Sequence, residues 1–199
     1  MSSARPPGRP REFDTDSVLD AALELFWLHG YRATTTRELE RAVGLSQSSL
    51  YNAFGSKGQL LDAALDRYES RLTNDLLSPL ETASTGLASI DAFLAALGEW
   101  LALGQRGCML VNMMVEDGGG SPEISARTRG YRMRLRQAFE GALERATSLG
   151  ELEPPIEHRA NMLVAVVIGL NVAARGGAAG PELAALVSGT RAEVTRWSS

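Results

Sequence analysis

Residues 34–58 read TTTRELERAVGLSQSSLYNAFGSKG, and this stretch decides how the first part of the chain folds. Thr35 and Glu38 have the spacing of a capping box, in which two side chains satisfy free backbone donors at a helix start. Gly44 ends that helix, and Ser46 caps a second one. The stretch therefore predicts two short helices joined by a tight turn, which is the layout of a helix-turn-helix motif.

The first turns of the second predicted helix carry polar side chains of the kind that contact DNA bases: Gln47, Ser48, Ser49 and Asn52. In a helix-turn-helix these side chains approach base edges, and Gln or Asn can form two hydrogen bonds to adenine. Leu50 and Phe54 supply the apolar anchor behind them. A helical hairpin with a solvated polar face has the same spacing, so the pattern alone leaves both interpretations open.

The rest of the chain also has apolar residues at helical spacing, and no segment has the alternation of a strand. A helix before the motif begins at Asp14 or Asp16 and ends at Gly30. Later helices are expected around residues 93–101, from Ser121-Pro122 onward, at 157–175 and at 181–197. The predicted fold class is therefore all-α.

Lys57 lies in a second predicted capping box, residues 56–59, which starts a helix that continues to Leu72. Its charge opposes the helix dipole at that position, so we expect it to serve another purpose. A phosphate at this helix terminus would contact both Lys57 and the free backbone donors. A solvated surface lysine is the alternative.

Residues 1–11 contain three arginines and no acidic residue, although the whole chain has a formal net charge of -4. The prolines among them exclude a helix and keep this arm extended. An extended arm could place Arg9 and Arg11 in the narrow minor groove of A·T-rich DNA. A disordered tail that attracts DNA without sequence preference is the alternative.

The composition argues against several classes of protein. Cys108 is the one cysteine, which excludes a disulfide within the chain, and His29 and His158 are too far apart to suggest a structural zinc site. The longest apolar stretch, residues 160–174, is shorter than the ~18 residues of a membrane span, and no signal sequence precedes it. We therefore expect a cytoplasmic protein with no metal, cofactor or membrane segment.

Cys108 itself permits two interpretations. It follows Arg106-Gly107 near a possible helix start, where the helix dipole and the guanidinium group would favour a reactive thiolate. Alternatively it is a small buried residue, and burial raises the pKa of a thiol. We expect the buried interpretation and predict that Cys108 is dispensable for DNA binding.

Bulky, adaptable side chains gather on consecutive predicted helices of the second half: Trp100, Met109, Met113, Met114, Tyr131 and Phe139. Methionine and aromatic residues make pockets that accept varied apolar ligands. The sequence therefore predicts a site for a small apolar or aromatic effector at these residues. Each of them could equally belong to the hydrophobic core.

The combination of Thr34–Leu39, Gly44-Leu45-Ser46, Leu50–Phe54 and Lys57 with Leu60-Leu61 resembles the DNA-binding domain of TetR-type transcriptional regulators. The resemblance covers residues 13–65 or so. It implies a flexible basic arm (1–12), a three-helix DNA-binding domain with the helix-turn-helix (13–58) and a larger helical domain for ligand binding and dimerisation (59–199).

The family's roles can be carried over to the matching positions. Thr36, Tyr51 and Lys57 should then contact phosphate, and the side chains that approach bases should be Arg37, Gln47, Ser48 and Ser49, with Asn52 beside them. The family usually has His or another aromatic residue around Asn52-Ala53, where this chain is smaller and polar.

These features together predict a ligand-responsive homodimeric regulator, most often a repressor in this family, that binds a palindromic double-stranded DNA operator. The dimer should form through residues 157–175, which are too apolar to face water, and 181–197, whose apolar stripe ends at Trp197. No Gly-rich phosphate loop, metal cluster or catalytic triad indicates an enzyme. The alternative is an architectural DNA-binding protein without a ligand.

Overall fold

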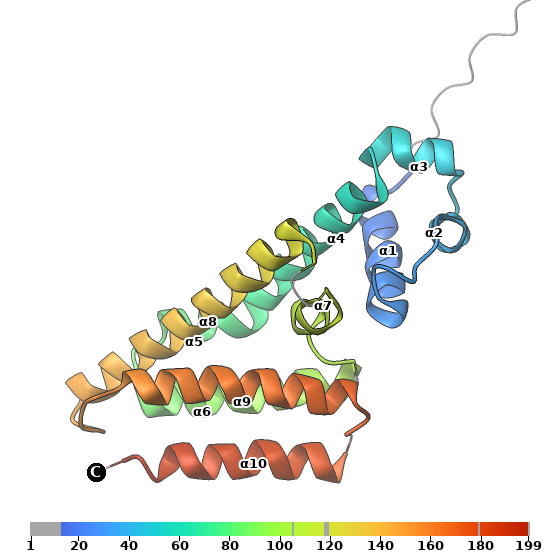
Figure 1. Cartoon of the computed structure of the whole chain (residues 1–199). Coiled ribbons are helices and arrows are strands. Elements are labelled where there is room, and N and C mark those ends of the chain that lie inside the picture. The colour runs from blue at the N-terminus through green and yellow to red at the C-terminus, as the bar shows by residue number, and fades with distance from the viewer. Residues whose placement is uncertain (1–12, 105, 118–119, 179, 199) are drawn as a thin grey trace, which may run out of the picture.

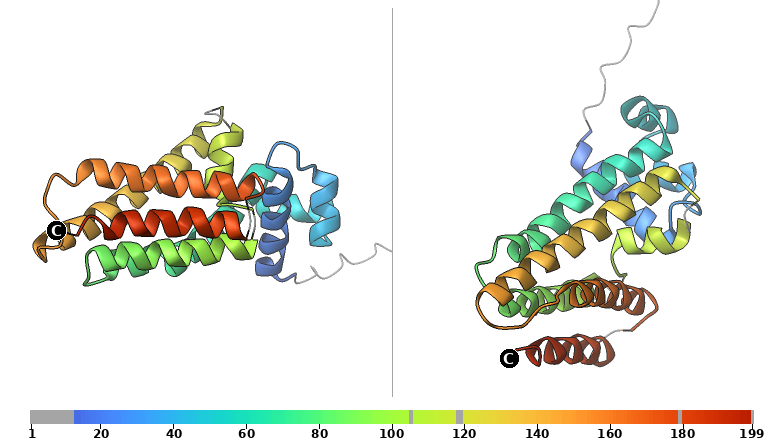
Figure 2. Two further views of the ribbon diagram at one scale, coloured as in Figure 1. Left: turned by 90° about the horizontal axis from the view of Figure 1, so that it is seen from below. Right: turned by 60° about the vertical axis from the view of Figure 1, so that its left-hand side comes forward.

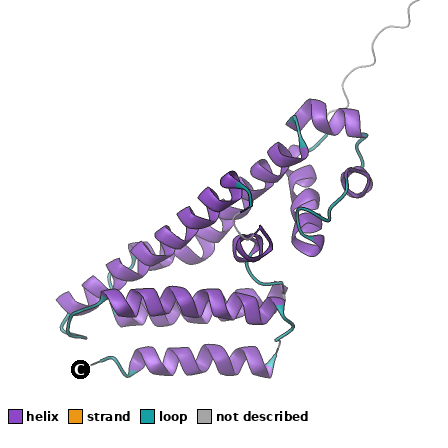
Figure 3. Cartoon of the chain, in the orientation of Figure 1, coloured by secondary structure: helices purple, strands orange, loops and turns teal. Residues whose placement is uncertain are grey.

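The computed structural model describes residues 13–104, 106–117, 120–178 and 180–198. Within these ranges the chain consists of helices and their connections and has no strand, as Figure 3 shows, so the predicted all-α fold is confirmed. The predicted basic arm, with Arg9 and Arg11, lies outside the described residues.

Three helices form one end of the molecule, which we call the head: α1 (Thr15–His29) and the short α2 (Thr36–Val43) and α3 (Gln47–Phe54) (Figure 1). Asp14 caps α1 by accepting a hydrogen bond of 3.2 Å from the backbone N–H of Asp16. Gly44 adopts the left-handed conformation that ends α2, with φ of 69°. Leu39 and Leu50 are fully buried beneath the two short helices. The predicted boundaries of the motif are therefore confirmed.

The long helix α4 (Lys57–Leu72) leads away from the head and packs against α1. Ser56 caps it by accepting from the backbone N–H of Gln59 at 3.2 Å. It continues into a π-helical turn, η1 (Thr73–Leu77), and the short α5 (Ser78–Thr82). Because α4 contributes buried side chains at both of its ends, it connects the head rigidly to the rest of the fold.

The remaining helices form a larger unit, which we call the body: α6 (Leu87–Gly104), α7 (Met109–Asp117), α8 (Pro122–Ser148), α9 (Glu157–Arg175) and α10 (Pro181–Thr195). In Figure 1, α8 runs beside α4, whereas α6, α9 and α10 lie together below them and the short α7 lies between α9 and the head. Phe93 and Phe139 meet edge to face in the core of the body, with ring centroids 5.2 Å apart.

Two apolar helices of the body, α6 and α10, differ from what the sequence predicts about membrane spans and about the dimer interface. Within the described residues, α6 is long and apolar enough to cross a membrane by length and composition alone, and its buried side chains pack against α8, α9 and α10. Figure 2 shows α10 running beside α6 and α9. Much of its apolar stripe points inward: Val187 lies against Gly98 of α6, and Leu183 and Val194 are buried. Only the outer part of that stripe remains for a second chain.

Candidate nucleic-acid interface

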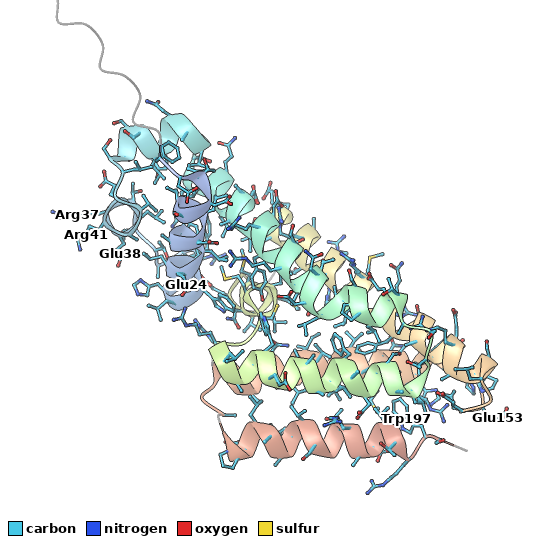
Figure 4. The ribbon with its side chains drawn as sticks, turned by 180° about the vertical axis from the view of Figure 1, so that it is seen from behind. Glu24, Arg37, Glu38, Arg41, Glu153 and Trp197 are labelled. Carbon is cyan, nitrogen blue, oxygen red and sulfur yellow. The ribbon has the colours of Figure 1, made fainter. Side chains whose placement is uncertain are left out.

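The start of α2 is fixed by the predicted capping box. The Thr35 hydroxyl accepts from the backbone N–H of Glu38 at 3.3 Å, and the Glu38 carboxylate accepts from the backbone N–H of Thr35 at 2.7 Å. This backbone hydrogen bond lowers the pKa of Glu38, so the carboxylate stays ionised at neutral pH. Figure 4 shows Arg37 and Arg41 extending outward from the same short helix, where a nucleic acid could reach them.

The start of α3, the recognition helix of the motif, is held by two residues. Ser46 accepts from the backbone N–H of Ser49 at 3.3 Å. Glu40 of α2 accepts from the backbone N–H of Gln47 at 2.6 Å, and a carboxylate at a helix N-terminus is stabilising. Local sequence spacing does not predict the role of Glu40, because its contact joins two helices.

The side chains predicted to contact bases are at the surface. Arg37, Gln47, Ser48, Ser49 and Asn52 are all exposed. Within this group the two serine hydroxyls each lie 3.0 Å from the Ser46 hydroxyl. The arrangement presents donors and acceptors on the first turn of α3, as readout through a major groove requires.

The three residues predicted to contact phosphate are half-buried. Thr36 Oγ1 and the Tyr51 hydroxyl lie 2.9 Å apart, so α2 and α3 present these two groups together. Lys57 Nζ lies 4.5 Å from the ring centroid of Tyr31, a cation–π contact that the sequence pattern does not predict. Burial lowers the pKa of Lys57, whereas the negative charges of Glu116 and Glu38 raise it.

Contacts between head and body converge on the end of α1. Arg106 pairs with Glu24 of α1, and the backbone oxygen of Arg106 accepts from Trp27 Nε1 at 3.4 Å. Arg175, at the end of α9, donates to the backbone oxygen of Trp27 at 2.9 Å and to that of Leu28 at 3.5 Å. These are carbonyls of the last turn of α1, which have no partner within their own helix.

Most residues predicted to bind an effector lie in the interior. Trp100 belongs to an aromatic cluster with Trp27 and Tyr68, whose ring centroids are 5.9 and 6.1 Å from its own. Met109 and Phe139 are fully buried, Met113 is nearly so, and Met114 and Tyr131 are half-buried. Met109 donates its backbone N–H to the Tyr68 hydroxyl at 3.1 Å, which places it beside the cluster, whereas Phe139 packs against Phe93.

Tyr131 also lines an open groove between α4, η1 and α8. The groove has a volume of about 430 Å³, and Arg127 and Arg134 lie along it. Both guanidinium groups are paired: Arg127 with Glu69 at 2.8 Å and Arg134 with Glu81 at 2.8 Å. A ligand in this groove would therefore meet the edge of Tyr131 and two neutralised arginines.

Cys108 is buried at the start of α7, as the buried interpretation predicts. The Tyr68 hydroxyl donates to its sulfur at 3.2 Å, and the Tyr131 side chain also hydrogen-bonds with Cys108. Burial raises the pKa of the Cys108 thiol despite these hydrogen bonds. The described residues contain no group of three or more His, Cys, Asp or Glu side chains that could hold a metal ion.

Comparison with known proteins agrees with this geometry. Residues 18–64 match the family described as bacterial regulatory proteins, tetR family, and residues 86–180 match a tetracyclin repressor-like C-terminal domain. The transcriptional repressor ComR of Escherichia coli K12 is 31% identical over 176 residues, which cover 86% of this chain and 84% of the relative.

Solved structures show the same fold. The regulator CifR, as a cysteine mutant complexed with double-strand operator DNA, is 26% identical with a TM-score of 0.81 over 96% of this chain and all of its own. AibR, solved with isovaleryl coenzyme A and operator DNA, is 18% identical with a TM-score of 0.70 over 90% of this chain and 96% of its own. The chain belongs to the TetR family of DNA-binding transcriptional regulators.

Proposed function

We propose that the protein is a homodimeric repressor, cytoplasmic and ligand-responsive, that binds a palindromic operator. The observation that carries the proposal is the exposed polar face at the start of α3, which Ser46 and Glu40 hold in place. The repressor role is supported by the similarity to ComR. The division into an arm (1–12), a DNA-binding domain (13–58) and a ligand-binding and dimerisation domain (59–199) is part of the same proposal.

DNA contacts follow from this arrangement. Thr36, Tyr51 and Lys57 position the head by contacting phosphate, and the base-reading set is Arg37, Gln47, Ser48, Ser49 and Asn52. Arg9 and Arg11 of the arm enter the adjacent minor groove. A symmetric dimer would place two α3 helices in successive major grooves, about 34–36 Å apart, which requires a palindromic site.

The dimer forms through the outer faces of α9 and α10. Three large apolar side chains there face solvent: Met162 is 39% exposed, Val172 46% and Leu186 43%. Apolar residues gathered on adjoining helices favour association, and a two-fold axis brings the same face of each copy together.

The effector binds beside the aromatic cluster. Trp100, Met109, Met113, Met114 and Tyr131 surround it from α6, α7 and α8, and Phe139 supports the site from the core. Entry is from the groove at Tyr131. An apolar or aromatic molecule fits this lining, because methionine side chains are adaptable and their sulfur atoms make favourable contacts with aromatic rings.

Footprinting tests the proposal. The protein is added to DNA from upstream of its own gene and of neighbouring genes, with the Gln47→Ala variant as the control for base reading. A protected palindrome that the variant protects poorly supports the proposal. Equal protection of all sequences would instead indicate an architectural DNA-binding protein.

A further inference from the structure

A series of contacts connects α7 of the body with Lys57 at the start of α4. Glu116, in the last turn of α7, accepts from the backbone N–H of Arg32 through Oε1 at 3.2 Å. Its carboxylate also lies against Gly30, where a Cβ atom would come within 2.5 and 2.6 Å of the two oxygens. Gly30 has φ of 82°, a backbone conformation that favours glycine.

The turn that Glu116 contacts carries Tyr31. The Tyr31 ring packs on Phe26 of α1, with centroids 5.9 Å apart, and supports Lys57 Nζ at 4.5 Å from its own centroid. The position of this ring therefore decides where the ammonium group of Lys57 lies.

We propose that Glu116 is a positioning residue for DNA binding: by holding the Gly30–Arg32 turn, it keeps Tyr31 against Lys57 so that the ammonium group faces the DNA phosphate. This rests on the phosphate contact proposed above for Lys57.

The same contacts make the head sensitive to the effector site. Met113 lies one turn before Glu116 on α7 and is buried. A small cavity of about 10 Å³ is lined by Tyr31, Arg32, Met113, Glu116 and Ile124. A ligand that shifts this turn of α7, and does not merely repack the Met113 side chain, would therefore move Glu116 away from the Gly30–Arg32 turn.

Two substitutions at Glu116 separate its hydrogen bond from its charge. Glu116→Gln keeps an acceptor for the Arg32 N–H, whereas Glu116→Ala removes it. Binding is measured by fluorescence anisotropy with a labelled random-sequence DNA duplex at several salt concentrations, because phosphate contacts also operate in non-specific binding. Glu144→Ala, an exposed glutamate towards the far end of α8, is the matched control.

We expect Glu116→Ala to bind about two- to fivefold more weakly, the range for loss of an exposed cation–π contact. Its salt slope should fall towards that of Lys57→Ala, whereas Glu116→Gln and Glu144→Ala should resemble the wild type. In a Lys57→Ala background, Glu116→Ala should have no further effect. Thermal melting of each variant checks that the fold is retained.

Two results would overturn the inference: wild-type or tighter binding by Glu116→Ala, or the same loss with and without Lys57. A loss that Glu116→Gln shares would show that the charge acts and the hydrogen bond does not, which also overturns it. If Lys57→Ala itself changes neither the affinity nor the salt slope, the proposed phosphate contact of Lys57 is wrong. That result would contradict the proposed DNA contact, and not the contact between Glu116 and the Gly30–Arg32 turn.

Discussion

At the residue scale, DNA recognition separates into side chains that position the head and side chains that select a sequence. Lys57→Ala should weaken binding to all sequences alike and reduce the salt slope by about 1, because one phosphate contact is lost. Gln47→Ala should cost about 1–3 kcal/mol on the preferred site and relax the choice of particular base pairs. Anisotropy titrations with the footprinted site and a scrambled duplex measure both effects, and equal loss of specificity in the two variants would contradict the assignment.

Cys108 provides a second prediction at this scale. Cys108→Ser should bind DNA as the wild type does, and peroxide or an alkylating agent should not release the wild type. The reason is that the sulfur is buried and its pKa is raised, which leaves little reactive thiolate. The measurement is operator binding before and after treatment. Release of the wild type but not of the serine variant would assign Cys108 a sensing role.

Local sequence signals predicted the residues that act within one helix turn. Thr35, Glu38 and Ser46 are caps, and their spacing alone identified them. Tyr31 and Glu40 could not be predicted in this way, because each contacts a residue of a neighbouring helix. The packing that brings such helices together has no signature in local sequence spacing.

At the scale of helices, α1 and α4 are joined by an ion-pair group. Asp20 of α1 accepts from Arg67 Nε at 2.8 Å and from Arg71 Nη2 at 2.7 Å, both on α4. The hydrogen bond from Arg67 holds the pKa of Asp20 below its unperturbed value of 3.8. The stabilisation is therefore fully present above pH 3.8 and is lost as the pH falls through the lower value of the folded state.

Asp20→Asn should accordingly lower the thermal midpoint of unfolding slightly at pH 7, since the pair is partly exposed. The difference from the wild type should disappear in acid. Melting curves across the acid range measure this, with Asp62→Asn, which pairs more distantly with Arg127 at 3.7 Å, as the comparison. A difference that persists below the titration of Asp20 would contradict the ionic origin.

The sequence predicted helix boundaries well where caps mark them, as at Asp14, Gly44 and Ser121. It did not predict the π-helical turn at Thr73–Leu77, because the wider hydrogen-bonding pattern has no characteristic residue types. The sequence pattern also assigned the whole apolar stripe of α10 to the dimer interface, whereas Val187 and its neighbours pack against other helices of the same chain. Periodicity shows that a face is buried but not which partner covers it.

At the scale of the whole molecule, the dimer proposal gives a direct test. Met162→Asp combined with Leu186→Asp should yield a monomer with lower operator affinity, because each places a charge on the exposed apolar face. Sedimentation measures the mass. Met133→Asp, at an exposed methionine of α8, is the matched control and should remain dimeric. Val167 is unsuitable for this test because it is fully buried in its own chain. A double variant that stays dimeric would place the interface elsewhere.

Effector coupling is the second whole-molecule prediction. Candidate apolar compounds from a thermal-shift screen are titrated with and without operator DNA. Release by about 100-fold requires about 2.7 kcal/mol of coupling, and DNA must weaken the compound by the same factor. Equal affinity in the two titrations would show that a compound, however tightly bound, is not the effector.

Arg175 connects the end of α9 to the end of α1. It ends α9, a helix of 19 residues and therefore about 28 Å long, whose outer face we assign to the dimer. A tilt of α9 by about 5° around its first turn would displace its far end by about 2.5 Å, enough to break hydrogen bonds of ordinary length. The end of α1 would then lose its hydrogen bonds from Arg175 while every helix stayed intact. If the chain dimerises through α9 as proposed, small rotations between the two copies would loosen the hold of the body on the DNA-reading end.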